Sequence, residues 1–532
     1  MKLSKYFGQI KKEFVEDFVY NSIFKCTVFY AFVLGIVIHL FCLTNNLFNH
    51  DSVLTVYTNS DWLITQGKWF VTPLNIWKGV IALPYLGGIV GMLYVALSAA
   101  LLCVIFQIRS KVLAFLIAGI MAAFPTVATI LLYTSLDYFV AATFLAIAAA
   151  YLMSRKYIIC NILGVVSLTY SLGAYQAYIG FTASILVLLC GIKLLQKETR
   201  ISQVVKAGVY YVIQMITALG LYYLILQYIL AKSGEELTSY KGISNMSDNL
   251  KPSILLSSTV QAVKDVIFFI LKDSLGLGSK TAAMFFTMCI VVSMIIFMLI
   301  VIKRKLYKEP ARVILALIIF GILFPISVNL IGILSANTSF YYVSVYSLSM
   351  LFICAPIMVG QLEKEKTLTT WKECITIVMV VAVLMSVGQW IVQNNQGYQK
   401  IFVANENIKH KIDILITQIQ EQESFTTNTQ VIFVGDTPYD FLQTQGLGEA
   451  LQEVEIPGMI VSSASGIVYS KIVLEAYIRN YVSPNMTVVS EWKGEKTYEE
   501  ELKQMAIYPN KGSIQYIDGT IVVKLGSTEK QD

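Results

Sequence analysis

The sequence predicts a polytopic α-helical membrane protein with about eleven transmembrane helices and a C-terminal extracytoplasmic α/β domain. Of its 532 residues, 56% are hydrophobic and 14% are charged, and the mean hydropathy is +0.65. An ordinary soluble domain has roughly 25% charged residues. Formal charge is also divided unevenly, with +13 on residues 1–392 and −7 on residues 393–532. This composition excludes a soluble enzyme, a disordered chain and a small disulfide scaffold.

Apolar segments of about 20 residues, the length that crosses a bilayer, define the predicted spans. They are 26–44, 82–107, 112–133, 137–153, 157–172, 176–195, 207–230, 281–302, 313–333, 341–360 and 373–392. The apolar stretch 157–195 is too long for one helix, and we expect it to be split at Gly173-Ala174-Tyr175-Gln176. Residues 1–25 precede the first span as a charged, amphipathic N-terminus that we expect to be retained.

Lys and Arg residues set the predicted orientation in the cytoplasmic membrane, because they collect in cytoplasmic loops. With the N-terminus of the chain in the cytoplasm, 21 of them lie in inner segments and eight in outer segments before residue 393. The transmembrane domain is then 26–392, with large outer loops at 45–81 and 231–280. Within the second loop, the charged amphipathic stretch 263–278 predicts a helix that lies in the membrane interface.

The tail, residues 393–532, is predicted to be an extracytoplasmic α/β domain. Residues 430–436 (QVIFVGD) indicate a buried strand that ends in a turn, and residues 465–482 have helical periodicity. Residues 513–525 predict a hairpin, because Asp518-Gly519 is a two-residue turn of the type that needs positive φ.

Cysteine and histidine spacing gives no sign of a metal site. All eight cysteines lie at or before Cys374, mostly in apolar runs where Cys behaves as a small hydrophobic residue. The three histidines, at 39, 50 and 410, are far apart, so zinc is not expected. A divalent metal is neither supported nor excluded. His39 lies inside the first span, where we expect a polar packing residue.

The first outer loop has the most informative polar residues. His50 and Asp51 directly follow the first span, and Asp61, Lys68 and Trp69 follow in the same loop. A carboxylate at the membrane boundary is partly desolvated, which raises its basicity and suits it to accept a proton from a hydroxyl. The structural alternative for Asp51 is an N-cap, and His50 could be a simple interfacial residue.

Three further residues on the predicted outer side are candidates for substrate binding. Asp137 begins the fourth span, where an acid is either functional or a helix cap. Tyr175 and Gln176 lie between spans five and six, where the amide could bind sugar hydroxyls or a phosphate. The alternative for Gln176 is a hydrogen bond between helices. Asp51, Asp61 and Asp137 are the only acids on this side before residue 231.

Phosphate-binding signals are weak. Lys241, Lys251, Lys264 and Lys272 in the second outer loop could each hold a lipid phosphate as a point charge, or could simply extend to the interface. The sequence has no Walker motif, nucleophile elbow or HExxH motif, so we do not expect ATP-driven chemistry. Nor does the basic membrane region indicate nucleic acid, since membrane proteins collect Lys and Arg in inner loops.

The chain resembles the GtrII-type integral-membrane glucosyltransferases of the C-type glycosyltransferase (GT-C) superfamily. The resemblance covers roughly residues 25–390. It depends on a first span that ends near an outer Asp, the GKWF element at 67–70, Asp137 on the outer side, and SLGAYQAYIG at 171–180.

This resemblance implies a GT-C-like fold and a polyprenyl-phosphate-linked hexose, usually glucose, as the donor. The sugar would be transferred to an envelope polysaccharide on the outer face of a bacterial cytoplasmic membrane, with inversion at the anomeric carbon. Asp51 matches the position of the general base. Partners could include a donor synthase and a small flippase, besides the lipid bilayer. Asp61 or Asp137 would position the acceptor or support Asp51, while His50, Lys68, Trp69, Tyr175 and Gln176 would contact substrate.

One departure from the superfamily concerns the leaving phosphate. Many members have an Arg near the last outer loops, but residues 333–348 contain no Arg or Lys. Alternative functions are a lipid-linked sugar flippase or transporter, and a polymerase or ligase of envelope polysaccharide. A transporter needs polar residues near the bilayer midplane, and here the candidate acids lie on one side.

Overall fold

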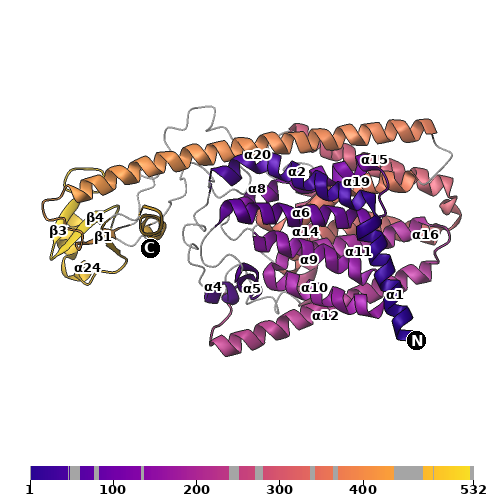
Figure 1. Ribbon diagram of the computed structural model, residues 1–532, viewed down its shortest axis with the longest axis horizontal. Coiled ribbons are helices and arrows are strands. Elements are labelled where there is room, and N and C mark those ends of the chain that lie inside the picture. Colours follow the sequence, from indigo (N-terminus) through magenta and orange to yellow (C-terminus); the bar gives the residue numbers. More distant parts are fainter. Residues whose placement is uncertain are drawn as a thin grey trace.

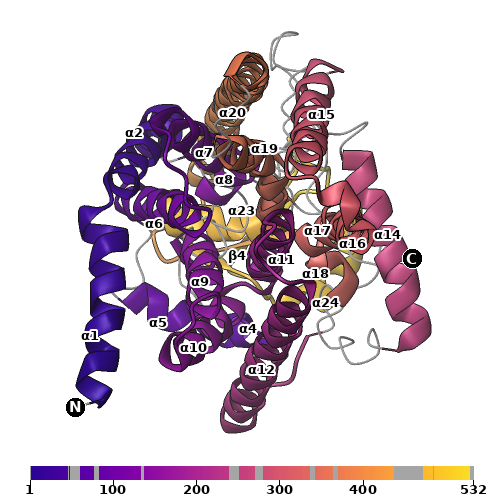
Figure 2. The ribbon, with the colours of Figure 1, turned by 90° about the vertical axis from the view of Figure 1, so that its right-hand side faces the viewer.

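Figure 1 shows a helical bundle and a small C-terminal domain joined by one very long helix. The structure is a computed structural model. The structure describes residues 2–45, 47, 60–76, 83–132, 137–238, 251–269, 280–335, 342–363, 369–435, 471–482 and 485–527. Figure 2 looks along the bundle and shows α11 near its centre, with α2 and α6 on one side and α14 and α16 on the other.

Apolar helices form the bundle, and their order follows the predicted spans. They are α2 (Ser22–Thr44), α6 (Pro84–Ile105), α7 (Lys111–Ala123), α8 (Pro125–Leu131), α9 (Asp137–Met153), α10 (Ile158–Ala174), α11 (Ile179–Leu195), α12 (Ile201–Ser233), α15 (Lys280–Lys303), α16 (Pro310–Ile318), α17 (Phe324–Val328), α18 (Leu330–Leu334), α19 (Ser349–Leu362) and α20 (Thr369–Gln420). Two short helices, α4 (Ser60–Thr65) and α5 (Val71–Asn75), precede α6, and α14 (Pro252–Phe268) precedes α15.

Fewer than eleven helices are both long enough and apolar enough to count as membrane spans. Within the described ranges, seven helices are long and apolar enough to cross a membrane, or eight if the bent pair α7–α8 counts as one span. Three shorter apolar helices, at 138–153, 158–174 and 346–362, coincide with other predicted spans. The total of eleven therefore stays a prediction. The predicted split of 157–195 is confirmed, because α10 ends at Ala174 and α11 starts at Ile179.

Helices α7 and α8 bend by 44° at Phe124-Pro125, and this bend explains several buried polar residues. In a continuous helix the carbonyl of Met121 would accept from residue 125, but proline has no N–H group. Tyr346 Oη donates to this carbonyl instead, and His39 Nε2 and Asn394 Nδ2 donate to the next two, those of Ala122 and Ala123. Each donor comes from a different part of the chain. His39 is thus a packing residue, as expected.

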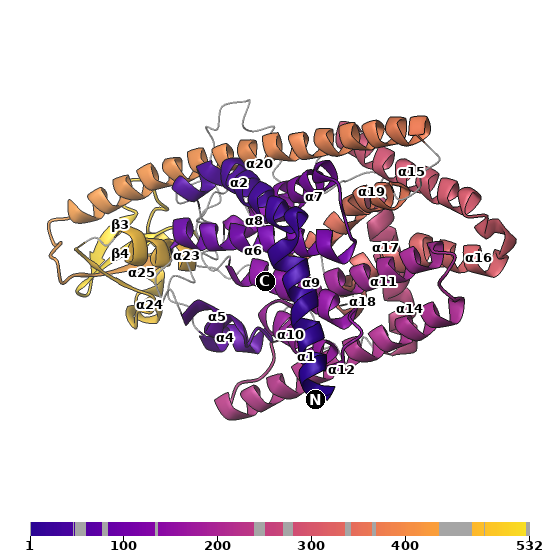
Figure 3. The same ribbon diagram turned by 45° about the vertical axis from the view of Figure 1, so that its right-hand side comes forward.

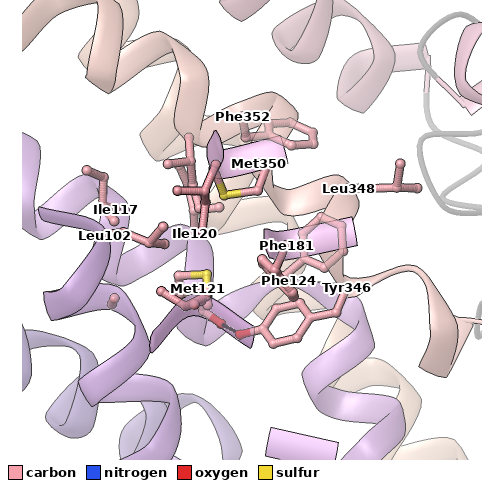
Figure 4. Packing of buried hydrophobic residues seen from close by; sticks show 14 of the residues in the cluster. Leu102, Ile117, Ile120, Met121, Phe124, Phe181, Tyr346, Leu348, Met350 and Phe352 are labelled. Atoms are coloured by element: carbon pink, nitrogen blue, oxygen red, sulfur yellow. Dashed lines mark hydrogen bonds between the residues drawn. The ribbon is translucent and has the colours of Figure 1, made fainter. Parts of the chain in front are cut away.

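Aromatic rings fill the space around this bend. Figure 4 shows Phe124, Phe181 and Tyr346 packed together in the core. Phe124 stacks on Tyr346 with ring centroids 5.9 Å apart, and Phe181 meets Tyr346 edge to face at 5.3 Å. Trp390, on α20, contacts Phe124 from another direction at 5.2 Å. The bend is therefore fixed both by hydrogen bonds and by packing.

We expect His39→Leu to lower stability by about 1–3 kcal/mol, the cost of leaving a buried polar group unpaired. Both the Ala122 carbonyl and Tyr398 Oη, which lies 2.7 Å from His39 Nδ1, would lose a partner. The measurement is the apparent melting temperature in detergent. Ser386→Ala is the control, because among the described residues the buried Ser386 hydroxyl bonds only to the Ala382 carbonyl of its own helix. Equal melting temperatures for the two variants would contradict the structural role of His39.

The N-terminal helix α1 (Lys2–Phe14) runs across one end of the bundle, opposite to the C-terminal domain (Figures 1 and 2). Charged side chains fasten this region to the connection between α9 and α10. Arg155 pairs with Asp17 and stacks over Tyr151, with the guanidinium carbon 4.2 Å from the ring centroid. Lys156 Nζ lies 2.9 Å from Glu13, and its hydrogen bond is the main cause that lowers the pKa of that carboxyl group.

Helix α20 continues well past the predicted end of the last span. Its 52 residues rise about 78 Å at 1.5 Å per residue, whereas the hydrocarbon core of a bilayer is about 30 Å thick. The predicted domain boundary at 392–393 thus falls inside one helix. Packing changes only between Phe402, which contacts the bundle core, and Ile408, which belongs to the core of the C-terminal domain.

The C-terminal domain contains a four-stranded sheet of order β2-β1-β4-β3. The elements are β1 (Gln430–Val434), α23 (Lys471–Tyr477), β2 (Thr487–Val489), α24 (Gly494–Thr497), α25 (Glu499–Gln504), β3 (Ile514–Ile517) and β4 (Thr520–Lys524). Strand β1 pairs parallel with β2 and β4, while β3 and β4 form an antiparallel hairpin. The predicted hairpin turn is confirmed, with φ of 44° at Asp518 and 77° at Gly519.

Candidate functional site

Four predicted site residues, Lys68, Trp69, Tyr175 and Gln176, meet at the end of the bundle that carries α4 and α5 (Figure 3). Two others, His50 and Asp51, lie outside the described residues. Asp61 lies in α4 and Asp137 is the first residue of α9, but their side chains are likewise outside the described part. The C-terminal domain occupies the same end of the molecule (Figures 1 and 3).

A turn at Gly67 ends α4 and directs the GKWF element, residues 67–70, toward the bundle. The Gly67 N–H donates to the Ile64 carbonyl, and the Lys68 N–H donates to the Leu63 carbonyl. With φ of +73° at Gly67, this is a Schellman motif, which requires a left-handed residue directly after the helix. The turn therefore sets where Lys68 and Trp69 leave α4.

Trp69 and Phe70 then dock on the end of α10. The Phe70 N–H donates to the Gly173 carbonyl at 2.8 Å, and both rings pack on Tyr170, with centroids 5.6 and 4.5 Å away. A Cβ atom at Gly173 would come within 2.6 Å of the Trp69 ring, so only glycine allows this approach. Among the described residues, the buried Trp69 Nε1 has no hydrogen-bond partner. Trp69 thus holds the loop in place.

Gln176 connects the first loop to α12. Its Nε2 donates to the Gln66 carbonyl and to Tyr222 Oη, both at 3.0 Å. Tyr222 Oη in turn donates to the Gly67 carbonyl at 3.1 Å. Through Tyr222, the amide nitrogen of Gln176 is therefore bonded to α12. An interhelical hydrogen bond of this kind was the predicted alternative to ligand binding. Within the described part of the chain, no group donates a hydrogen bond to Gln176 Oε1, so this oxygen can accept from a hydroxyl of a ligand.

Lys68 lies beside an aromatic cluster at the start of α9. Its Nζ donates to Gln66 Oε1 at 2.8 Å and is 5.6 Å from the ring centroid of Tyr175 and 6.0 Å from that of Tyr138. Such distances allow cation–π attraction. Because Tyr138 directly follows Asp137, the fold brings the start of α9 to Lys68. The site thus combines an ammonium group, phenol rings and an amide oxygen.

An apolar groove of about 680 Å³ runs between α11, α12 and the segment from α16 to α18. Its lining is hydrophobic along most of its length, and residues such as Val212, Ile216 and Leu323 have large exposed fractions there. Ile179 and Leu219 also line the groove. Each lies about one helical turn from Gln176 or Tyr222, so the groove passes close to the polar cluster.

Tyr222 and Gln66 belong to the site, although the sequence did not mark them. Tyr222 and Tyr223 are adjacent, identical residues in one apolar segment, and only the fold distinguishes them. Tyr222 is 6% exposed and faces Gln176, whereas Tyr223 is 57% exposed. Nothing in the hydropathy pattern separates the two.

Comparison with known proteins gives one finding. A family model described as Glucosyl transferase GtrII matches residues 40–353, more than half of the chain. The match includes α4, α5, the Gln176 cluster and the apolar groove. No curated protein and no solved structure matches the chain.

Proposed function

This chain belongs to the GtrII glucosyltransferase family, and we propose that it transfers glucose from a polyprenyl-phosphate donor to an envelope polysaccharide. Its apolar helices agree with a membrane-bound transferase. The reaction takes place on the outer face of the cytoplasmic membrane, where the first outer loop and the C-terminal domain lie. The observation that carries the proposal is the apolar groove beside the Gln176–Tyr222 cluster.

The groove suits a polyprenyl tail. A long branched hydrocarbon needs an apolar channel that opens toward lipid, because unpaired polar groups along the tail would cost free energy. The groove between α11, α12 and α16–α18 has this character. A lipid tail in it places the attached phosphate and sugar near Gln176, at the end of the bundle that carries α4 and α5.

Lys68 and Gln176 are the proposed contacts of the donor head group. The Lys68 ammonium group provides the positive charge that binds the phosphate. Residues 333–348 contain no Arg or Lys that could do so. Gln176 Oε1 accepts from a sugar hydroxyl. The rings of Tyr138 and Tyr175 lie beside the Lys68 ammonium group and hold it in place by cation–π attraction.

The proposed reaction is a direct displacement that inverts the anomeric carbon. Asp51 takes the proton of an acceptor hydroxyl while that oxygen bonds to the anomeric carbon. The bond from this carbon to the phosphate oxygen breaks, and polyprenyl phosphate leaves with the electron pair. Asp61 or Asp137 orients the acceptor. No nucleotide takes part in this step.

The test is incorporation of labelled glucose by the purified protein. Detergent-solubilised enzyme is mixed with polyprenyl-phosphate glucose and envelope polysaccharide from host cells that lack the gene. We expect label in the polymer at a new side-chain linkage. If the gene instead changes polymer length or export without adding a hexose, the function is that of a polymerase, ligase or flippase.

Gly208→Leu tests whether the groove holds the donor tail. Gly208 lines the groove, and among the described residues a Cβ atom there would meet Cys190 Sγ alone, at 3.9 Å, an ordinary contact distance. A larger side chain at this position therefore narrows the groove. We expect KM for a long-chain donor to rise about tenfold, or about 1.4 kcal/mol. KM for a donor with a short prenyl tail should stay the same.

Gly220→Leu is the matched control. It lies on the same helix, is not part of the groove lining, and has open space around its Cβ position. Both variants improve helix propensity by a similar amount. An equal rise of KM in both variants, or no rise in Gly208→Leu, would show that the tail binds elsewhere.

A further inference from the structure

A second cleft, separate from the bundle, lies in the C-terminal domain. Its volume is about 520 Å³, within the usual range for small-ligand sites, roughly 300–1,000 Å³. It is lined by Trp492, Lys493, Glu495, Lys496, Glu499 and Leu502. Trp492 comes three residues after β2, which runs parallel to β1. The cleft therefore lies beyond the carboxyl end of a parallel strand, where open α/β sheets commonly bind ligands.

Trp492, which lines this cleft, is held by a stacked ring, Tyr498, that does not line it. Trp492 and Tyr498 are half-buried, with centroids 5.7 Å apart and ring planes only 10° from parallel. Gly494 passes close to the indole, since a Cβ atom there would lie within 2.7 Å of Trp492 Cη2. These contacts fix the orientation of the indole before any ligand binds.

Helix α25, which contributes Glu499 and Leu502 to the lining, is fixed to the sheet. The buried ammonium group of Lys524, on β4, donates to the carbonyls of Lys503 and Met505, both at 3.0 Å. These carbonyls lie at the C-terminal end of α25, where a cation is favourable. Lys503 Nζ also lies 2.9 Å from Glu499, which orients that carboxylate at the cleft.

The charges at the rim are balanced. The lining includes two lysines, Lys493 and Lys496, and two glutamates, Glu495 and Glu499, and all four residues are exposed. No ion pair engages Lys493, Glu495 or Lys496 among the described residues. A balanced rim does not select a strongly charged ligand, but its donors and acceptors match neutral hydroxyl groups. Beside a fixed indole, which packs against the C–H face of a pyranose, this chemistry fits a sugar.

The position of the cleft agrees with a role in acceptor binding. Figures 1 and 3 show α24 on the side of the C-terminal domain that faces away from α20, the side on which α4 and α5 lie at this end of the bundle. We infer that the Trp492 cleft binds sugar units of the acceptor polysaccharide next to the unit that is glucosylated. This inference rests on the proposed function, and it assigns the C-terminal domain the task of holding the polymer.

Binding of the full-length protein to immobilised polysaccharide tests this inference without catalysis. The polysaccharide is purified from host cells that lack the gene, so that its acceptor positions are unmodified. We expect Trp492→Ala to weaken binding at least tenfold. The double variant Glu495→Ala/Lys496→Ala, which leaves the ring stack in place, should weaken it about threefold. Tyr516→Ala is the matched control, because it removes an aromatic residue on β3 that is 50% exposed and does not line the cleft.

Transfer assays distinguish this inference from the proposed function. With Trp492→Ala, KM for the polymer should rise at least tenfold, while kcat/KM for a short acceptor fragment stays that of the wild type. If the wild type transfers no glucose, the proposed function fails. If the wild type transfers glucose and both cleft variants bind and use the polymer as well as it does, the inference alone is overturned. Should Trp492→Ala misfold, the double variant decides.

Discussion

Replacing Asp51 with Asn is expected to abolish glucose transfer while the amount of membrane-inserted protein stays the same. An amide cannot take the proton of the acceptor hydroxyl, and a positioned general base accounts for about 10²–10⁴-fold in rate. The loss should appear in kcat, because Asn has nearly the shape of Asp and differs from it in lacking a basic carboxylate. The measurement is the initial rate of label incorporation at saturating donor and acceptor.

Asp265→Asn is the control for this experiment. Asp265 lies on α14 in the second predicted outer segment, and its carboxylate accepts a hydrogen bond from Gln261 in the same helix. Removing its charge therefore changes the outer side without touching the proposed site. If Asp51→Asn transfers glucose at the rate of the wild type, Asp51 is not the base, and Asp61→Asn and Asp137→Asn become the next variants to test. A loss in Asp265→Asn equal to that in Asp51→Asn would indicate a general effect of charge.

Local sequence signals predicted those parts of the structure that depend on local rules. The division at 173–176 follows from an apolar run that exceeds one span and contains Gly and Gln. The turn at 518–519 follows from the positive φ that Asp-Gly favours. The strand at 430–434 follows from its unbroken run of β-branched and aromatic residues. Each of these needs only a few neighbouring residues.

Features that depend on tertiary contacts were not predictable in the same way. Hydropathy falls after residue 392, but α20 continues because Ile408, Ile412, Leu415 and Ile419 keep a helical spacing and pack on the C-terminal sheet. The donors to the carbonyls at the α7–α8 bend come from α2, α20 and Tyr346. The hydrogen bond that His39 makes there is therefore visible only in the assembled bundle.

The candidate site was predicted only in part, because some of its residues have local sequence signals and others depend on tertiary contacts. Lys68, Trp69, Tyr175 and Gln176 stand out in sequence, because polar residues interrupt the apolar pattern at these positions and Trp and Tyr collect where spans end. Tyr222 does not stand out, because it is one of many tyrosines in apolar segments. Its role depends on Gly67, whose carbonyl it contacts across more than 150 residues of sequence.

Gly67→Ala should break this site while the protein stays folded. A Cβ atom at position 67 would overlap Tyr222 Oη and come within 2.7 Å of Gln176 Nε2. Both atoms are at the ends of side chains and can move, so the clash is relieved by displacing the cluster rather than by unfolding the bundle. A misplacement of about 1 Å at a site of this kind can cost about 100-fold in rate, and we expect kcat/KM to fall by about that factor.

The backbone cost of alanine must be separated from this steric effect, and Gly234→Ala does so. Gly234 has φ of +74°, nearly the same as Gly67, but none of the described residues lies within 4 Å of its Cβ position. In both variants, the left-handed conformation of alanine therefore costs about 1–2 kcal/mol of stability. Only Gly67→Ala also displaces Tyr222 and Gln176. Adding Tyr222→Phe to Gly67→Ala removes the overlapping hydroxyl and should restore part of the activity. Equal activity in the two alanine variants would mean that the Gln176–Tyr222 cluster does not position the donor, and the donor head group would then have to bind nearer to Asp51 and Asp137.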